Sequence, residues 1–161
     1  MSVMRRHQQQ LDQEASLEIL KHASSGVLSL IDEEGLPYGV PLNYVLYEGN
    51  LYFHCATEGK KLLAIASHPA ASFTVIERDE VVSELYTSLF RSVIVFGTIK
   101  PIEGERWTEA FDAFCDKYSA DRPLAERRQK VRSCTKAIGL MLTVEQITGK
   151  EAKELANISY S

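Results

Sequence analysis

The sequence is poor in the residues that bind metals or crosslink a chain. Its 161 residues include three cysteines and four histidines. Cys55, Cys115 and Cys134 are odd in number and far apart, so they have neither the spacing of a zinc site nor the pairing of a disulfide framework. The histidines show no metal-ligand spacing either. We therefore expect no metal site, and we expect a chain that works in the reducing cytoplasm.

Long hydrophobic runs and an excess of positive charge are also missing. No stretch approaches the ~20 apolar residues of a membrane-spanning helix, and the N-terminal segment MSVMRRHQQQLDQE lacks the apolar region of a secretory signal. The formal net charge of −4 argues against broad nucleic-acid binding. The basic run between Arg127 and Arg132 is interpreted as a solvated helix face. Neither a membrane nor a nucleic acid is expected as a partner.

Familiar phosphate-binding and catalytic signatures are absent as well. There is no Gly-rich Walker or dinucleotide fingerprint, so nucleotide sites of those types are not expected. No Ser/His/Asp arrangement or carboxylate pair supports a catalytic mechanism. The hypothesis that the remaining residues support is a cofactor that carries a phosphate.

What the sequence does contain is a succession of strand patterns with a few helices between them. Strands are predicted at 27–31, 36–47, 51–56, 71–76, 90–102 and 137–144, and helices at 12–23, 59–67, 105–118 and 124–132. The early turns are too short for parallel crossovers, so the sheet should be largely antiparallel, and curling it into a small barrel would remove its exposed edges. We predict one domain over residues 1–161, mainly β with α.

A cationic helix start follows the strand at 51–56. The chain breaks at Thr57-Glu58-Gly59, and the helical pattern opens on Lys60 and Lys61. Amide groups in the first turn of a helix lack internal partners, and the helix dipole favours an anion there. These residues therefore predict a phosphate site. A solvated lysine pair on a surface helix is an equal alternative.

Three further polar features have both a binding and a structural interpretation. His54 either contacts a ligand and moves a proton, or bonds a neighbouring carbonyl. The strand Pro41-Leu42-Asn43-Tyr44 either presents unpaired backbone groups to a flat heteroaromatic ring, or is an edge protected by its proline. Ser92 bonds either a ligand or the adjacent turn. The aromatic stripe of the third predicted helix is interpreted as core: Trp107, Phe111, Phe114 and Tyr118.

Four segments of the chain together resemble a known family, the flavin-binding split-barrel superfamily. They are PYGVPLNYVLYEGNLYFHCATEGKKL, HPAASFTV, FRSVIVFG and ITGKEA, and the resemblance covers about residues 5–152. Within the superfamily, the chain looks like the pyridoxamine-5′-phosphate-oxidase-related branch that includes nitroimidazole-resistance proteins. The resemblance implies a six-stranded antiparallel split β-barrel with a Greek key and flanking helices. It also implies a homodimer that binds flavin mononucleotide (FMN) at the dimer interface.

The resemblance further implies which residues bind FMN. The matching positions are Val40, Pro41, Leu42 and Asn43 beside the isoalloxazine ring, His54, Cys55, Ala56 and Thr57 along the pocket, Lys60 and Lys61 on the phosphate, and Ser92 and Lys150 from later segments. In the nitroimidazole-resistance branch, the histidine that matches His54 lies close to the flavin. His54 is therefore the candidate catalytic residue.

The function implied is that of an FMN-dependent reductase. It would pass electrons from a nicotinamide or another donor to a small electrophile such as a nitroaromatic compound. True vitamin B6 oxidases carry a basic residue on the strand that corresponds to 39–44 and end in an Arg-His-Arg-type segment, and this chain has neither. Pyridoxamine phosphate oxidation is therefore not expected. Two alternatives stay open: a flavin- or haem-binding module without turnover, and a structural dimer that has lost its cofactor.

Overall fold

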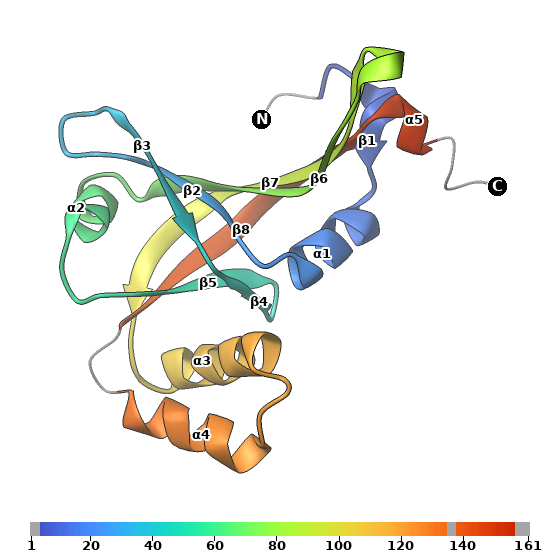
Figure 1. Cartoon of the computed structure of the whole chain (residues 1–161). Coiled ribbons are helices and arrows are strands. Elements are labelled where there is room, and N and C mark those ends of the chain that lie inside the picture. The colour runs from blue at the N-terminus through green and yellow to red at the C-terminus, as the bar shows by residue number, and fades with distance from the viewer. Residues whose placement is uncertain (1–3, 135–137, 157–161) are drawn as a thin grey trace.

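The computed structural model describes residues 4–134 and 138–156, and its strands join in a single sheet (Figure 1). The strands are β1 Gln10–Leu11, β2 Gly26–Ile31, β3 Pro37–Leu42, β4 Val45–Tyr47, β5 Asn50–Cys55, β6 Ala70–Val82, β7 Thr87–Ile102 and β8 Ile138–Glu151. The helices are α1 Gln13–His22, α2 Lys60–Ser67, α3 Gly104–Tyr118, α4 Leu124–Ser133 and α5 Lys153–Ala156. The prediction of a mainly β fold with flanking helices is confirmed. The described part of the sheet has eight strands where six were predicted.

One source of the difference is the second predicted strand, at 36–47, which is two strands. β3 ends at Leu42 and β4 begins at Val45, so Asn43 and Tyr44 lie between them. β3 pairs with β2 at one end of the strand order, and β4 pairs with β5 at the other. The chain must cross between two edges of the sheet here, which one continuous strand cannot do. The edge position of β3 suits Pro41, because proline has no N–H to donate to a ladder.

The strand order β3-β2-β6-β7-β8-β5-β4 explains why the sheet curls. All neighbouring strands are antiparallel, as predicted. The two edge strands, β3 and β4, are separated by only two residues, and consecutive Cα atoms lie about 3.8 Å apart. The two edges of the sheet must therefore come close together. The sheet wraps into a barrel that stays open between β3 and β4, which is a split barrel (Figure 1).

β6, β7 and β8 extend beyond their predicted ends. β6 and β7 pair as far as Val82 and Thr87, and their hairpin projects from the body of the barrel (Figure 1). The charged run at 77–80 hides this extension, because it breaks the apolar alternation that predicts a strand. β8 continues to Glu151, well past the predicted end at 144, and the predicted first residue of that strand lies outside the described residues.

The barrel interior is filled by apolar side chains from the strands and two helices. Leu51, Phe53 and Cys55 of β5 face this core. α1 adds Ile19 and Leu20, and α2 adds Ala64 and Ile65. Asp12 caps α1, since its carboxylate accepts a hydrogen bond from the amide of Ala15 at 2.7 Å. Both helices are held against the barrel by the apolar face that their sequence period predicts.

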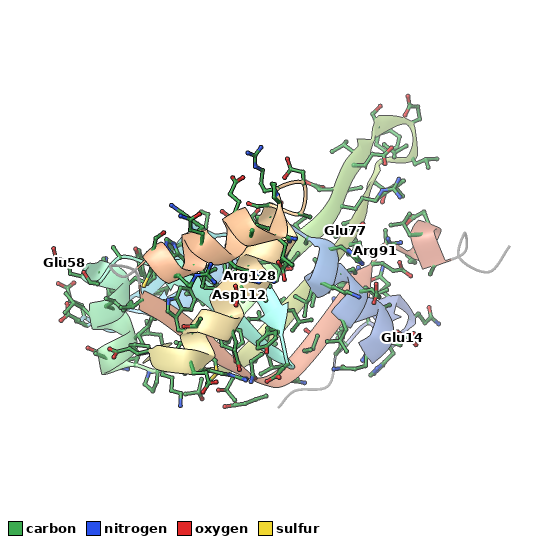
Figure 2. The ribbon with its side chains drawn as sticks, turned by 90° about the horizontal axis from the view of Figure 1, so that it is seen from below. Glu14, Glu58, Glu77, Arg91, Asp112 and Arg128 are labelled. Atoms are coloured by element: carbon green, nitrogen blue, oxygen red, sulfur yellow. The ribbon has the colours of Figure 1, made fainter. Side chains whose placement is uncertain are left out.

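α3 and α4 form a separate layer on the outer surface of β4, β5 and β8 (Figure 1). The buried residues of this layer are Val45, Tyr52, Trp107, Ala110, Phe111 and Val131. The basic run of α4 is more than a solvated face. Arg127 and Arg128 lie 2.8 and 2.9 Å from the carboxylate oxygens of Asp116, and Arg128 also pairs with Asp112 at 2.9 Å (Figure 2). These ion pairs join the two helices.

Candidate functional site

A groove on the outside of the barrel lies between the end of β3, strand β5 and the helices α3 and α4. Its volume is about 480 Å³, which is in the range of small-molecule sites. The groove is lined by Pro41, Leu42, Asn43, His54, Phe111, Phe114, Lys130 and Cys134. The first four of these are predicted site residues. They come from the end of β3, the residue after it and β5, and the curl of the barrel brings them together.

His54 points away from the barrel core toward α3. The alternation of β5 buries both of its neighbours, Phe53 and Cys55, on the opposite face. Its ring centroid lies 5.8 Å from that of Phe111 and 6.2 Å from that of Trp107, with interplanar angles of 26°. Burial lowers the pKa of His54, and the nearby charge of Lys61 lowers it further. The imidazole is therefore neutral at pH 7 and has one donor and one acceptor nitrogen.

The aromatic surface beneath His54 depends on a glycine in β8. The rings of Trp107 and Phe111 stack with a centroid distance of 5.2 Å and an interplanar angle of 6°. Gly139 pairs directly with His54 across the β5–β8 ladder, and a Cβ at this position would overlap the Trp107 ring. The absent side chain therefore lets the indole lie flat on the strand beside the histidine.

The predicted helix start is confirmed in α2. Gly59 has a φ of 134°, a conformation that favours glycine, and it turns the chain from the loop into the helix. Because Gly59 has no side chain, it cannot cap the amides of the first turn. Lys60 and Lys61 occupy that turn. The N-terminus of α2 thus combines uncapped amides with positive charge, which is an arrangement suited to an anion.

The two lysines have different surroundings. Lys60 Nζ lies 3.3 Å from Oδ2 of Asp32 and 4.9 Å from the ring centroid of Tyr38. Lys61 lies close enough to the end of β5 for its charge to lower the pKa of His54 and to offset part of the rise that burial causes in the pKa of Cys55. Of the two lysines, Lys61 is therefore the one whose charge acts on His54 in the groove.

Asp32, which no sequence motif marks as part of a site, explains the orientation of Lys60. This residue is only 7% exposed, and its Oδ1 accepts hydrogen bonds from the amides of Glu34 at 3.0 Å and Leu36 at 2.8 Å. The Leu36 amide lowers the pKa of Asp32 most, against an opposing effect of burial, and Lys60 and the Glu34 amide lower it further. Asp32 stays ionised and holds both the β2–β3 turn and Lys60.

Four other predicted site residues do not line the groove. Val40 lies opposite Leu28 in the ladder and packs against the barrel core. Cys55 is 6% exposed and belongs to the same core. Both side chains face the interior, so these residues can meet a ligand in the groove only through their backbone. Ala56 and Thr57 are exposed in the loop that leads from β5 to α2.

Ser92 and Lys150 lie far from the groove. They face each other across the β7–β8 ladder, whereas His54 pairs with Gly139 at the other end of β8. At about 3.3 Å per residue, Gly139 and Lys150 are roughly 35 Å apart along the strand. In Figure 2, Glu58, just before α2, lies at one end of the molecule, and Arg91, next to Ser92, lies well away from it. The predicted residues thus form two groups that a single chain does not bring together.

A family model for pyridoxamine 5′-phosphate oxidase matches residues 12–151, a range that includes every predicted site residue. The chain belongs to the pyridoxamine 5′-phosphate oxidase family. This membership agrees with the split barrel and with the resemblance that the sequence motifs indicated. No curated protein sequence matches the chain.

Solved structures share the fold of this pyridoxamine 5′-phosphate oxidase family member. A candidate 5-nitroimidazole antibiotic resistance protein from Bacteroides thetaiotaomicron has a TM-score of 0.72 and 23% identity, over 88% of this chain and 86% of that chain. The conserved hypothetical protein Rv2991 from Mycobacterium tuberculosis has a TM-score of 0.79 and 15% identity, over 94% and 92%. An FAD and haem binding protein from Mycobacterium smegmatis has a TM-score of 0.68 and 18% identity, over 95% and 80%. At these identities the likeness establishes the fold.

Half of the groove comes from residues that were not assigned to a site. In this family member, α3 contributes Phe111 and Phe114, while Lys130 and Cys134 come from α4 and its end. The interpretation of the α3 stripe as core holds for Trp107 and Phe111, but Phe114 is only half-buried and Tyr118 is 37% exposed. Nothing in the sequence distinguishes Lys130 or Cys134.

The described residues contain neither a candidate membrane-spanning helix nor a candidate metal cluster. None of the described helices is both long and apolar enough to cross a bilayer. Within the same part of the chain, no three or more His, Cys, Asp or Glu side chains gather as metal ligands do.

Proposed function

We propose that this protein binds FMN in the groove and uses it to reduce small electrophiles such as nitroaromatic compounds. The observation that carries the proposal is the meeting of Pro41–Asn43 and His54 beside the cationic, uncapped start of α2. Membership of the family and the fold shared with an FAD and haem binding protein support flavin binding. The fold shared with a candidate nitroimidazole-resistance protein supports the class of substrate.

The residues of the groove suit a flat ring with a phosphate tail. β3 is an edge strand, so backbone groups near Pro41 and Asn43 are available to the donors and acceptors along the edge of a flavin ring. Phe111 and Phe114 provide an apolar wall on the opposite side. Lys61 and the first-turn amides of α2 would hold the phosphate.

When bound, the flavin supplies the redox chemistry, and the protein supplies position, hydrogen bonds and exclusion of water. His54 presents a neutral imidazole to the groove, so it can donate a hydrogen bond to a substrate or deliver a proton. Its contact with Trp107 and Phe111 restricts the orientation of the ring. The charge of Lys61 helps to keep the imidazole neutral. The electrons would come from a nicotinamide or another reduced donor.

Two chains would complete each site. Because Ser92 and Lys150 lie at the far end of β8 from His54, they can contact the same flavin only from a second copy of the chain. In a homodimer with FMN at its interface, the groove residues around His54 of one chain and Ser92 and Lys150 of the other would contact the same flavin. Light scattering of the FMN-loaded protein tests this arrangement, and a monomer that still binds FMN would contradict it.

Flavin binding has a direct test. Protein stripped of any chromophore and titrated with FMN should quench flavin fluorescence to saturation, and the freshly purified protein should be yellow. Released chromophore identified by mass should be FMN. A colourless protein that takes up no added FMN would contradict the proposal and favour a structural dimer.

A second candidate function is a flavin- or haem-binding module without turnover. The fold shared with an FAD and haem binding protein favours it, as does the single histidine in the groove. A yellow protein that oxidises no nicotinamide cofactor with any nitro or quinone acceptor would favour the flavin form. A strong Soret band after addition of haem, with no uptake of FMN, would favour the haem form.

Replacing His54 with alanine should separate binding from turnover. We expect FMN to remain bound, because the phosphate and the ring are held by other groups. Turnover should fall by roughly 100-fold or more, the usual contribution of a positioned acid or base. Steady-state reduction of a nitroaromatic acceptor measures the effect. Turnover equal to that of the unmodified protein would remove His54 from the mechanism.

A further inference from the structure

The crossing between β3 and β4 is held by the end of α3 rather than by a neighbouring strand. Asn43 and Tyr44 lie between strands at opposite edges of the sheet, so their backbone groups are outside the ladder. Tyr44 is fully buried, and buried backbone groups need hydrogen-bond partners. The last two residues of α3, Lys117 and Tyr118, supply them.

The hydroxyl of Tyr118 takes the place of a strand partner. It accepts a hydrogen bond from the amide of Tyr44 at 3.1 Å. It also lies 2.8 Å from the carbonyl of Tyr44 and 2.6 Å from the carbonyl of Ser24, and its single hydrogen is donated to one or the other. One side-chain oxygen thus joins the β3–β4 crossing to α3 and to the segment after α1.

Lys117 adds a second attachment at the same place. Its Nζ donates to the carbonyls of Ala23 at 2.6 Å and Tyr44 at 3.1 Å, and it lies 4.0 Å from the centroid of the Tyr44 ring. Burial lowers the pKa of Lys117 to about 8, so the ammonium group is still mainly protonated at pH 7 and donates to both carbonyls. In addition, the Tyr44 hydroxyl donates to the carbonyl of Leu20 at 2.5 Å.

These contacts lie next to the groove. Asn43, which lines it, donates through Nδ2 to the carbonyl of Ser24 at 2.8 Å, the same carbonyl that Tyr118 approaches. One helical turn before Tyr118, Phe114 lines the opposite wall, and the two rings stack with a centroid distance of 5.3 Å. A single helix therefore provides one wall of the groove and holds the strand end that forms the other.

We propose that Lys117 and Tyr118 are positioning residues that set the place of the ring-binding segment Pro41–Asn43 and hence the width of the groove. This inference rests on the proposed binding of FMN. It adds to that proposal two residues that lie outside the lining of the groove and act through the backbone of Tyr44 and through Asn43.

The Tyr118→Phe variant tests the proposal, because it removes the hydroxyl and keeps the ring. We expect the dissociation constant of FMN to rise roughly fivefold to tenfold, because the amide of the buried Tyr44 loses its hydrogen-bond partner. We also expect the visible absorption of the bound flavin to shift, since that spectrum reports on contacts to the ring. Tyr86→Phe is the matched control, because Tyr86 is 98% exposed and should change neither quantity.

Hydrogen exchange makes the test independent of the cofactor. The amides of residues 42–45 should exchange roughly tenfold faster in Tyr118→Phe than in Tyr86→Phe, in the absence of FMN. A variant that melts at a lower temperature but keeps the exchange, the affinity and the spectrum of the unmodified protein would overturn the proposal. If the unmodified protein binds no FMN, the proposed function fails, and the exchange measurement still decides whether Tyr118 holds this segment.

Lys117→Met provides a second variant should Tyr118→Phe fail to fold. Methionine keeps an unbranched apolar stem and removes the ammonium group. Its matched control is Lys100→Met on the exposed side of β7. We expect a weaker affinity for FMN in the Lys117 variant alone, and equal affinities in the two variants would count against a positioning role for the lysine.

Discussion

Replacing Lys61 with alanine is expected to weaken FMN binding tenfold or more, whereas replacing Lys60 should have a much smaller effect. A charge-assisted hydrogen bond contributes roughly 1.5–3 kcal/mol, and 1.4 kcal/mol is a tenfold change in affinity. Lys61 lies on the side of α2 whose charge reaches His54, while Lys60 is paired with Asp32 at 3.3 Å. Fluorescence titration of FMN with each single variant measures the difference.

Each lysine variant is the control for the other. Both substitutions remove one positive charge from the first turn of the same helix, so a general loss of charge would affect them equally. Lys60→Ala should instead lower the free energy of unfolding slightly, because it removes the solvent-exposed lysine that pairs with Asp32. Equal losses of affinity in the two variants would show that both lysines bind the phosphate. Unchanged affinity in Lys61→Ala would show that the ammonium group of Lys61 does not hold the phosphate.

The Gly139→Ala variant is expected to lose roughly 1–3 kcal/mol of folding free energy, which is typical of overpacking a filled core. The added methyl group would overlap the ring of Trp107, which is 7% exposed and has little room to move. Since Trp107 is the sole tryptophan of the chain, its fluorescence follows urea unfolding directly. The displaced indole should also disturb His54, and turnover should fall together with stability.

Gly39→Ala is the matched control for that experiment. Gly39 is also a strand glycine, but a Cβ there would lie 3.3 Å from Cγ1 of Val27, a tight contact that a small shift can relieve. We expect its unfolding midpoint in urea to stay close to that of the unmodified protein. If Gly139→Ala were as stable as Gly39→Ala, the Trp107 ring would be free to shift, and the surface beneath His54 would be less rigid than the structure indicates.

The strand and helix pattern was largely readable from the sequence, and its errors have physical causes. Alternation along β5 puts Leu51, Phe53 and Cys55 on one face, which the structure places in the core, and His54 on the other. It failed for 36–47, because strand periodicity cannot show that a chain changes edges at Asn43 and Tyr44. It also failed for the outer parts of β6 and β7. There the hairpin leaves the core, and backbone pairing continues without a buried face.

The candidate site was predicted only in pieces. The start of α2 was visible because Gly59 and the lysines are adjacent in the chain. The opposite wall of the groove was not, since Phe114 has the spacing of a core residue and shows its position only when α3 is placed on the sheet. Ser92 was grouped with His54 by resemblance, and the register of β8 shows that the two are far apart within one chain.

By itself, the sequence determined the local features of this protein: the antiparallel strands, the faces of β5 and the cationic start of α2. These features depend on residue periodicity and on neighbouring backbone groups, so residues that are close together in the sequence determine them. The tertiary structure alone decided that α3 would close the groove, that Asp32 would hold Lys60, and that Lys117 and Tyr118 would bind the β3–β4 crossing. Such contacts join distant segments, and they are set by how the barrel curls and how the helices pack on it.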